Sequence, residues 1–160
     1  MRRAYAVEAV RAAEQVLLDR LPAGALMQRA AAGLATVCAG LLGRVYGARV
    51  ALLVGSGNNG GDALVALRTL AEWGRNVRAV LAADRPDTES VLHGWRIPRE
   101  SDAALKGAAV ILDGVLGTGV RGAPRPRQAQ AIAAINASGR PVVALDVPSG
   151  VDANDGTTAG

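Results

Sequence analysis

Four short apolar runs, separated by segments with helical periodicity, limit the folds that this chain can adopt. Each run is rich in β-branched residues, has the length of a buried strand and is bounded by Gly, Pro or Asp. The runs are Arg49–Val54, Val77–Leu81, Ala109–Leu112 and Val142–Leu145. Because the strands are apolar throughout and alternate with helices, they predict an α/β fold with a mostly parallel sheet covered on both faces.

The helical segments complete this alternation. The expected helices are Val7–Asp19, Ala25–Leu42, Asp62–Trp73, a short Ser101–Leu105 with Ser101 as its cap, and Arg127–Ala137. No internal repeat and no low-complexity linker interrupts them. We therefore expect one domain over residues 1–160, with N-terminal helices in 1–45 and an α/β core in 46–160.

Composition argues against several classes of function. The net charge of +4 comes almost wholly from arginines that are scattered along the sequence without an aromatic platform, so nucleic-acid binding is not expected. Cys38 lies in an apolar helical pattern and is expected to be a small buried side chain. Glu8 interrupts the N-terminal stretch, which is therefore not a signal peptide. No stretch approaches the roughly 20 apolar residues of a membrane span, so we expect a cytoplasmic protein without membrane contact.

Polar, glycine-rich segments follow three of the four predicted strands. They are Gly55–Asp62, Asp113–Gly122 and Asp146–Asp152. In a parallel sheet, ligands bind outside the carboxyl ends of the strands. The three segments are therefore expected to converge into one site.

The first segment reads GSGNNGGD and contains the G-x-G-x-x-G pattern of dinucleotide-binding turns. Glycine-rich turns are common because tight turns need positive φ and close helix packing. Two adjacent asparagines exceed that need, and backbone N–H groups at a helix N-terminus suit a phosphate or a polar ring. Asp62 near the helix start can cap the helix and would compete with a pyrophosphate. Asp84, after the second strand, could bind a ribose, which keeps an NAD-dependent oxidoreductase open.

The second segment combines features for a cation and for an anion. Asp113 ends an apolar strand, where it serves either as a turn or helix cap or as a ligand. The Gly117-Thr118-Gly119 stretch exposes backbone N–H groups, and Arg121 can pair with an anion through its guanidinium. Together they predict a site that binds a cation at one end and a phosphate at the other.

Asp146 is the strongest candidate for chemistry. It follows the last strand among apolar residues, so partial desolvation should raise its pKa toward a value useful for proton transfer. The alternative is a structural Asp that caps the next turn through Ser149. Oxygen ligands from Asn59, Asp113 and Ser149 would suit a hard cation, and the lack of a carboxylate cluster favours a monovalent ion. His93 is the only histidine, so nothing supports zinc.

Three motifs in this order and spacing resemble the NAD(P)H-hydrate epimerase family, the YjeF N-terminal domain. They are Gly57–Asp62, Asp113–Gly119 and Asp146–Asp152, and Leu26–Gly33 is similar to the second helix of that family. The resemblance covers nearly the whole chain. It implies a Rossmann-like three-layer α/β/α sandwich, commonly dimeric, that interconverts the R and S forms of hydrated NADH and NADPH at C6 of the nicotinamide ring. It also implies a potassium ion as cofactor.

Residue by residue, the resemblance assigns a substrate-binding set and a potassium-binding set. The substrate-binding residues are Asn58, Asn59, Gly60, Gly61, Asp62, Gly117, Thr118, Gly119, Val120, Arg121, Gly122, Ala123 and Asp146. The potassium ligands are Asn59, Asp113 and Ser149. We hypothesise that Asp146 is catalytic and assists proton transfer as the C6 hydroxyl leaves and the centre re-forms.

The chain also departs from the family pattern. Ala63 stands where family members often carry Gly, residues 83–107 are short for their place, and the family domain usually continues beyond Gly160. In many bacteria the domain is fused to an ATP- or ADP-dependent dehydratase, and this chain could be a fragment of such a fusion. A non-catalytic binding or partner domain with the same fold is therefore a second hypothesis, and the NAD-dependent oxidoreductase is a third.

Overall fold

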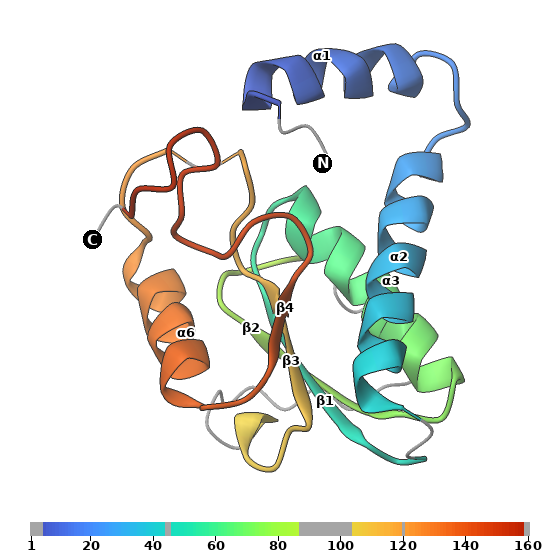
Figure 1. The fold of residues 1–160 in the computed structure, drawn as a ribbon, viewed down its shortest axis with the longest axis vertical. Helices are drawn as coiled ribbons and strands as arrows, with labels where there is room; N and C mark the ends of the chain where they lie inside the picture. The colour runs from blue at the N-terminus through green and yellow to red at the C-terminus, as the bar shows by residue number, and fades with distance from the viewer. Residues whose placement is uncertain (1–4, 44–45, 87–103, 120, 159–160) are drawn as a thin grey trace.

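The computed structural model describes residues 5–43, 46–86, 104–119 and 121–158 (Figure 1). At its centre is a four-stranded sheet with the order β2-β1-β3-β4, in which every neighbouring pair is parallel. The strands are β1 (Arg49–Val54), β2 (Asn76–Leu81), β3 (Val110–Gly114) and β4 (Val142–Ala144). The predicted parallel α/β sheet is confirmed.

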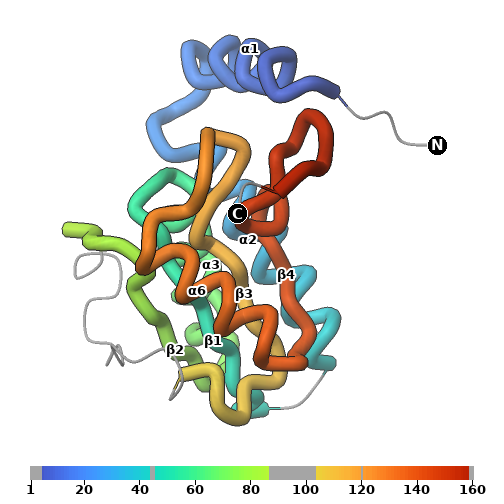
Figure 2. Tube along the Cα trace, turned by 90° about the vertical axis from the view of Figure 1, so that its left-hand side faces the viewer, coloured from blue at the N-terminus to red at the C-terminus, as the bar shows by residue number. Residues whose placement is uncertain are grey.

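The described residues contain four helices with assigned bounds, three of which pack on the sheet. They are α1 (Val7–Leu18), α2 (Ala25–Leu42), α3 (Asn58–Glu72) and α6 (Pro126–Ala137). In Figure 1, α2 and α3 cover one face of the sheet and α6 covers the other, which gives the three layers expected from the family resemblance. Helix α1 lies across the top, apart from the sheet, above the loops that follow the strands (Figure 2).

The two faces of β1 explain why its sequence is apolar throughout. Val50, Leu52 and Val54 belong to a core cluster with α2 and α3, whereas Ala51 and Leu53 belong to a second cluster with α6. All five side chains are fully buried. Successive strand residues point to opposite faces, so a strand with helices on both sides has no position that suits a polar residue.

Three predicted boundaries were wrong in ways that affect the site. Helix α3 begins at Asn58 and not at Asp62, and its N-cap is the extended Gly57. Asp62 therefore lies inside the helix and does not cap it. Asp113 is a buried residue within β3, and β4 ends at Ala144, two residues before Asp146. The apolar pattern missed the start of α3 and the end of β3 because regular structure there continues into polar residues, whereas β4 ends one residue before its apolar run does.

Helix α2 corrects a further expectation. By length and composition it could cross a membrane, since the mean hydropathy of its 18 residues is 1.4. The sequence analysis had expected no such stretch. A core helix of a soluble protein passes the same test, and α2 packs against the sheet through Leu34, Ala35 and Cys38. Cys38 is buried as predicted, and burial raises the pKa of its thiol to about 12.

Some predictions fall partly or wholly outside the described residues. His93 and Val120 lie there, as do most of the short 83–107 connection and the start of the predicted helix at Ser101. Ala104 and Leu105, at the end of that predicted helix, are helical and buried.

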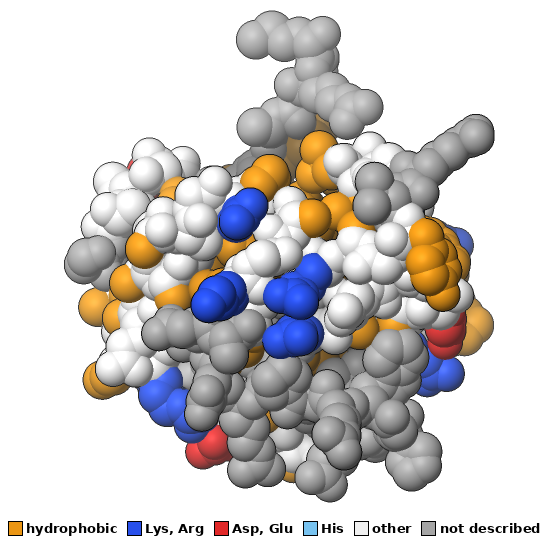
Figure 3. All heavy atoms as spheres, turned by 90° about the horizontal axis from the view of Figure 1, so that it is seen from below, with side chains coloured by type: hydrophobic (Ala, Val, Ile, Leu, Met, Phe, Trp, Pro, Cys, Tyr) orange, Lys and Arg blue, Asp and Glu red, His pale blue; other side chains and the backbone are white. Residues whose placement is uncertain are grey.

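The end of the sheet away from the strand-following loops carries a group of Lys and Arg side chains near the middle of the face in Figure 3. Some of the basic residues that are scattered along the sequence thus lie near one another on that face.

Candidate active site

The loops after β1, β3 and β4 meet at the carboxyl edge of the sheet, beneath α1 (Figure 2). Asn59, at the start of α3, donates from Nδ2 to the carbonyl oxygen of Leu116 at 2.7 Å. The N–H group of Leu116 in turn donates to Ser149 Oγ at 2.8 Å. These bonds join all three loops, so the predicted convergence is confirmed.

A buried hydrogen-bond network, which we call the Asp113–Ser149 network, lies at the base of these loops. Asp113 Oδ2 accepts from the N–H of Ser149 at 2.8 Å, and Oδ1 accepts from Ser149 Oγ at 2.5 Å and from the N–H of Val115 at 3.2 Å. Asp113 and Ser149 are both buried. A buried carboxylate needs such donors, because an unpaired charge away from water is costly. Ser149 is therefore bonded to Asp113 and not to Asp146, so the alternative in which Asp146 caps the turn through Ser149 is not supported.

The glycines of the first loop are needed for close approach. A Cβ on Gly55 would collide with the carbonyl of Val115, and one on Gly60 would collide with the carbonyl of Gly55. A Cβ on Gly114 would lie 2.7 Å from Cβ of Ala63. None of these glycines has positive φ. The loop after β1 thus lies directly against the end of β3. These glycines are required because there is no room for a side chain, and not because the backbone has positive φ.

Asn59 carries an unusual polar atom. Its Oδ1 is buried and has no hydrogen-bond partner in the structure, although its Nδ2 is well bonded. An orphaned oxygen beside the Asp113–Ser149 network is what an oxygen-coordinated cation would satisfy. The neighbouring donors are a single carboxylate, a hydroxyl and a backbone carbonyl, and no cluster of three or more His, Cys, Asp or Glu occurs among the described residues. This donor set fits a hard ion of low charge.

Asp146 stands at the rim of the site. Its Oδ2 accepts from the N–H of Thr118 at 2.8 Å, and the residue is exposed. A Cβ added to Gly117 would lie 2.9 Å from that Oδ2 and 3.3 Å from Asn59 Cβ, so Gly117 fills the space between the two side chains. The structure brings Asp146 to the site as predicted. The expected desolvation was wrong, because Asp146 lies two positions beyond the end of β4 and is exposed.

Asp62 is the carboxyl group among the predicted site residues whose pKa is raised. Burial raises its pKa from 3.8 to about 6, Arg85 nearby lowers it, and the negative charges of Glu14 and Asp146 raise it further. The side chain is half-buried. The sequence analysis assigned this property to Asp146. The sequence did not indicate this property for Asp62, because that residue was interpreted as a cap at the start of the helix.

Helix α1 lies over the site loops, which no sequence pattern indicated. Arg11 donates to the carbonyl of Thr118 at 3.0 Å, and Asn154 Oδ1 accepts from the N–H of Val7 at 3.1 Å. Arg121 and Glu8 are 3.9 Å apart, and both side chains are largely exposed. Arg121 therefore reaches toward α1. Among the other predicted substrate-binding residues, the exposed ones are Asn58, Gly119, Gly122 and Ala123.

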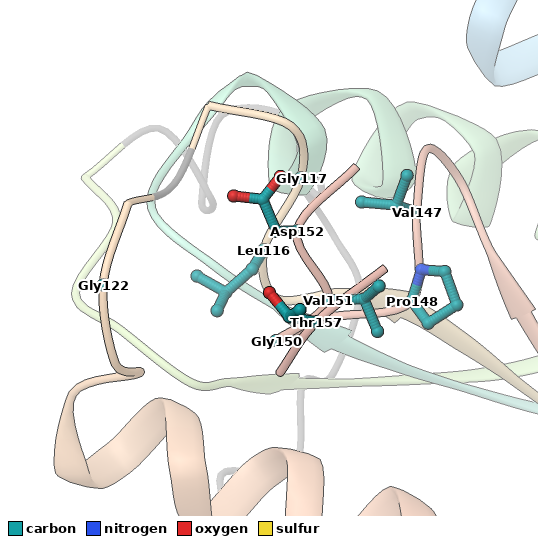
Figure 4. Close-up of a pocket in the computed structure, with 9 residues that line it drawn as sticks. All are labelled: Leu116, Gly117, Gly122, Val147, Pro148, Gly150, Val151, Asp152 and Thr157. Carbon is teal, nitrogen blue, oxygen red and sulfur yellow. The ribbon is translucent and has the colours of Figure 1, made fainter. Parts of the chain in front are cut away.

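A small pocket separates the loops after β3 and β4 (Figure 4). Its volume is about 80 Å³, and its walls are formed by Leu116, Gly117, Gly122, Val147, Pro148, Gly150, Val151, Asp152 and Thr157. That space holds a few water molecules, whereas a dinucleotide needs far more. A ligand of that size would lie across the open carboxyl edge, with Gly117 bordering both the pocket and Asp146.

Comparisons with known proteins agree with this arrangement. Residues 23–160 match the family described as YjeF-related protein N-terminus. The chain belongs to this family. It is 44% identical to the bifunctional NAD(P)H-hydrate repair enzyme of Mycobacterium tuberculosis (strain ATCC 25618 / H37Rv), and the match covers 100% of this chain and 35% of that protein. The chain thus spans about a third of the length of this relative.

A shorter relative and a solved structure complete the comparison. The NAD(P)H-hydrate epimerase of Clavibacter sepedonicus is 39% identical, with 95% of this chain and 72% of that protein covered. The crystal structure of a yeast protein, ynu0, superposes with a TM-score of 0.81 at 21% identity, over 94% of this chain and 72% of that chain. The yeast structure supports the fold, and the sequence relatives bear on function.

Proposed function

We propose that this chain is an NAD(P)H-hydrate epimerase, which interconverts the R and S forms of hydrated NADH and NADPH. The observation that carries the proposal is Asp146, a carboxylate exposed at the carboxyl edge and held by the N–H of Thr118 beside Asn59. The printed names of the relatives support the substrate, and the first loop has the backbone N–H groups that suit its diphosphate.

Asp146 would move the proton in both directions. In the forward step its carboxyl proton passes to the C6 hydroxyl, the C6–O bond breaks, water leaves, and the N1 lone pair forms a double bond to C6. Water then adds to the other face of C6, the electron pair returns to N1, and the carboxylate recovers a proton. These steps involve no net oxidation or reduction, so no oxidant is needed. Proton transfer of this kind typically contributes 10²–10⁴-fold to a rate.

Asp62 is the second candidate for a proton donor. With a pKa of about 6, about a tenth of its carboxyl groups are protonated at pH 7. It lies close enough to Asp146 for the two charges to interact. A pair of acids in one site, with one favoured in the neutral form by burial, is a common arrangement for acid–base catalysis.

A potassium ion is the proposed cofactor, with Asn59, Asp113 and Ser149 as its ligands. The orphaned Oδ1 of Asn59 supports this assignment, as does the single carboxylate in the set. When bound, the ion would supply a fixed positive charge next to the loops that hold the substrate. The chain's own residues orient the substrate and transfer the proton.

The oxidoreductase hypothesis loses its main support. Asp84 was its ribose-binding residue, but Asp84 Oδ1 accepts from Arg127 Nη1 at 2.9 Å and the side chain is almost fully exposed. The non-catalytic binding domain stays a competing hypothesis that an activity assay decides.

We also propose that the chain forms a homodimer. Large apolar side chains are exposed on α1 and on the outer side of α2, namely Val10, Val16, Leu17, Leu18, Val37 and Leu41. A second copy could cover them. An ATP- or ADP-dependent dehydratase, fused or separate, is the proposed partner in repair, in line with the longer bifunctional relatives.

Chromatography tests the epimerase directly. R-enriched hydrated NADPH is incubated with the protein in potassium or in sodium buffer, and formation of the S form is followed after subtraction of the spontaneous rate. The proposal expects protein-dependent conversion that is faster in potassium. A folded chain that leaves the spontaneous rate unchanged would contradict it.

A further inference from the structure

The order of the strands fixes where the two ends of a dinucleotide would lie. The reacting ring belongs beside Asp146, which follows the edge strand β4, and the N–H groups of the loops after β3 and β1 come next. Only β2 remains on the far side of β1. Three strand spacings, roughly 14 Å, separate β4 from β2. The adenosine half of the substrate therefore extends toward the end of β2.

Two residues of opposite charge, Asp84 and Arg85, follow β2. In dinucleotide-binding sheets an acid at this place accepts a hydrogen bond from the ribose 2′-hydroxyl, whereas an arginine accommodates a 2′-phosphate. Asp84 would favour a substrate without the phosphate, and Arg85 would favour one that carries it. Sequence alone does not decide between them.

The side chain of Asp84 is directed toward the α6 face of the sheet and not toward the glycine loop. Its Oδ1 accepts from Arg127 Nη1 at 2.9 Å, and Arg127 also donates to the carbonyl of Leu81 at 3.4 Å. Arg127 belongs to α6, on the face of the sheet opposite α3 (Figure 1). The carboxylate is thus paired with a cation away from the glycine loop.

Arg85 is directed to the glycine loop. Its Nη1 donates to the carbonyl of Gly57 at 2.6 Å and to that of Gly55 at 3.2 Å. A Cβ added to Gly61 would lie 2.7 Å from Nη2. The half-buried guanidinium therefore rests on the loop between β1 and α3, at the β2 side of the site.

Ser56 lies between the two glycines whose carbonyls accept from Arg85, and it is exposed. Ser56 thus lies on the stretch of loop against which the Arg85 guanidinium rests, on the path proposed for the adenosine ribose. A phosphate dianion takes charge-assisted hydrogen bonds from such a pair, and guanidinium matches phosphate geometry through two N–H groups.

We propose that Ser56 and Arg85 form a binding site for the ribose 2′-phosphate, so that the chain acts on hydrated NADPH in preference to hydrated NADH. The proposal rests on the epimerase function proposed above. Arg85 is a specificity-determining residue in this account, since it acts on the ribose phosphate and not on the reacting ring.

The test compares kcat/KM for the two hydrates in wild type, Arg85→Ala, Arg85→Lys and Ser56→Ala. We expect wild type to favour hydrated NADPH at least tenfold, and Arg85→Ala to bring that ratio close to one. Arg85→Lys should restore part of the preference, and Ser56→Ala should lower it by a few fold. Arg68→Ala, which removes an exposed arginine paired with Glu72, is the matched control and should leave the ratio unchanged.

A structural role for Arg85 predicts a different result. If the side chain only supports the loop carbonyls, Arg85→Ala lowers kcat/KM for both hydrates alike and keeps the ratio, which would overturn the proposal. Equal use of both hydrates by wild type would also overturn it, while the epimerase function would stand.

Calorimetric titration with ADP-ribose and with its 2′-phosphorylated form separates this inference from the epimerase function. Tighter binding of the phosphorylated probe, lost in Arg85→Ala, supports the site even in a preparation without epimerase activity. Equal binding of the two probes overturns the site. Binding of neither probe, together with no epimerisation by a folded chain, contradicts both the site and the function.

Discussion

The Asp113–Ser149 network and the open edge above it lie within one loop cluster, yet they differ in how far their polar atoms are hydrogen-bonded. In the network, both carboxylate oxygens of Asp113 are bonded and buried. At the edge, Asn59 keeps an orphaned oxygen, Asp62 has a raised pKa, and Asp146 has a single bond recorded among the described residues, to a backbone N–H. The satisfied region fixes the loops, and the edge keeps the groups that can respond to a ligand.

This contrast has a physical basis. A fully satisfied buried network has one favourable geometry, so it holds the loops after β3 and β4 in register. Groups at the edge are then held by backbone that has little freedom to relax around them. Catalytic groups need such support, because small displacements of a reacting group reduce rates strongly.

The largest expected effect follows from removal of the carboxylate in the network. Asp113→Ala leaves the N–H groups of Val115 and Ser149 without their acceptor in a buried place. We expect the free energy of unfolding to fall by about 3–5 kcal/mol, measured by urea denaturation. A loss below about 1 kcal/mol would mean that the network does not hold the loops.

A methyl group at the boundary between the two regions should affect activity more than stability. Gly117→Ala puts its Cβ 2.9 Å from Asp146 Oδ2 and 3.3 Å from Asn59 Cβ, so both side chains must shift. We expect kcat to fall about a hundredfold with a change in unfolding free energy of about 1 kcal/mol or less. Gly122→Ala is a poor control because Gly122 has positive φ, whereas Gly40→Ala in α2 adds a methyl group that meets nothing within 4 Å.

The hydroxyl in the network gives a smaller effect. Ser149→Ala removes the bond to Asp113 and the acceptor for the N–H of Leu116, while the N–H of residue 149 can still reach Asp113. We expect a loss of about 1–3 kcal/mol in unfolding free energy and a weaker response of activity to potassium. An unchanged potassium response would remove Ser149 from the proposed ligands.

The smallest effect concerns pH. The folded pKa of Asp62 is about 6 and its ordinary value is 3.8, so the unfolded chain ionises first as pH rises. Asp62 therefore lowers stability progressively between about pH 4 and pH 6, and the loss is complete above that range. In Asp62→Asn this decline should be reduced, as seen in urea midpoints at pH 4.5 and 7. If the protonated acid takes part in turnover, the variant also loses the fall in rate above about pH 6.

The sequence predicted the sheet and the three loops because their signals are local. Apolar runs report burial on both faces, and glycine-rich polar segments report turns at the strand ends. The properties of individual acids depend on what other segments bring near them. Asp62 is desolvated within a helix that begins earlier than the apolar pattern indicated, and Asp146 is exposed because β4 is short.

The same limit applies to Arg85. Its place after β2 follows from the sequence, but only the neighbouring Asp84 was considered as a ribose-binding residue. Only the bonds of Asp84 to Arg127 and of Arg85 to Gly55 and Gly57 distinguish the two. Helix α1 itself was predicted, but its position over the site was not, since its contacts with Thr118 and Asn154 join residues far apart in the sequence.

The central claim is that this chain epimerises hydrated nicotinamide nucleotides and that Asp146 transfers the proton. The most direct measurement is the initial rate of R-to-S conversion of hydrated NADPH by wild type and by Asp146→Asn in potassium buffer, with binding of the 2′-phosphorylated ADP-ribose measured in parallel. The account predicts a loss of 10²–10⁴-fold in rate with binding nearly unchanged. Equal rates in the two proteins would contradict it.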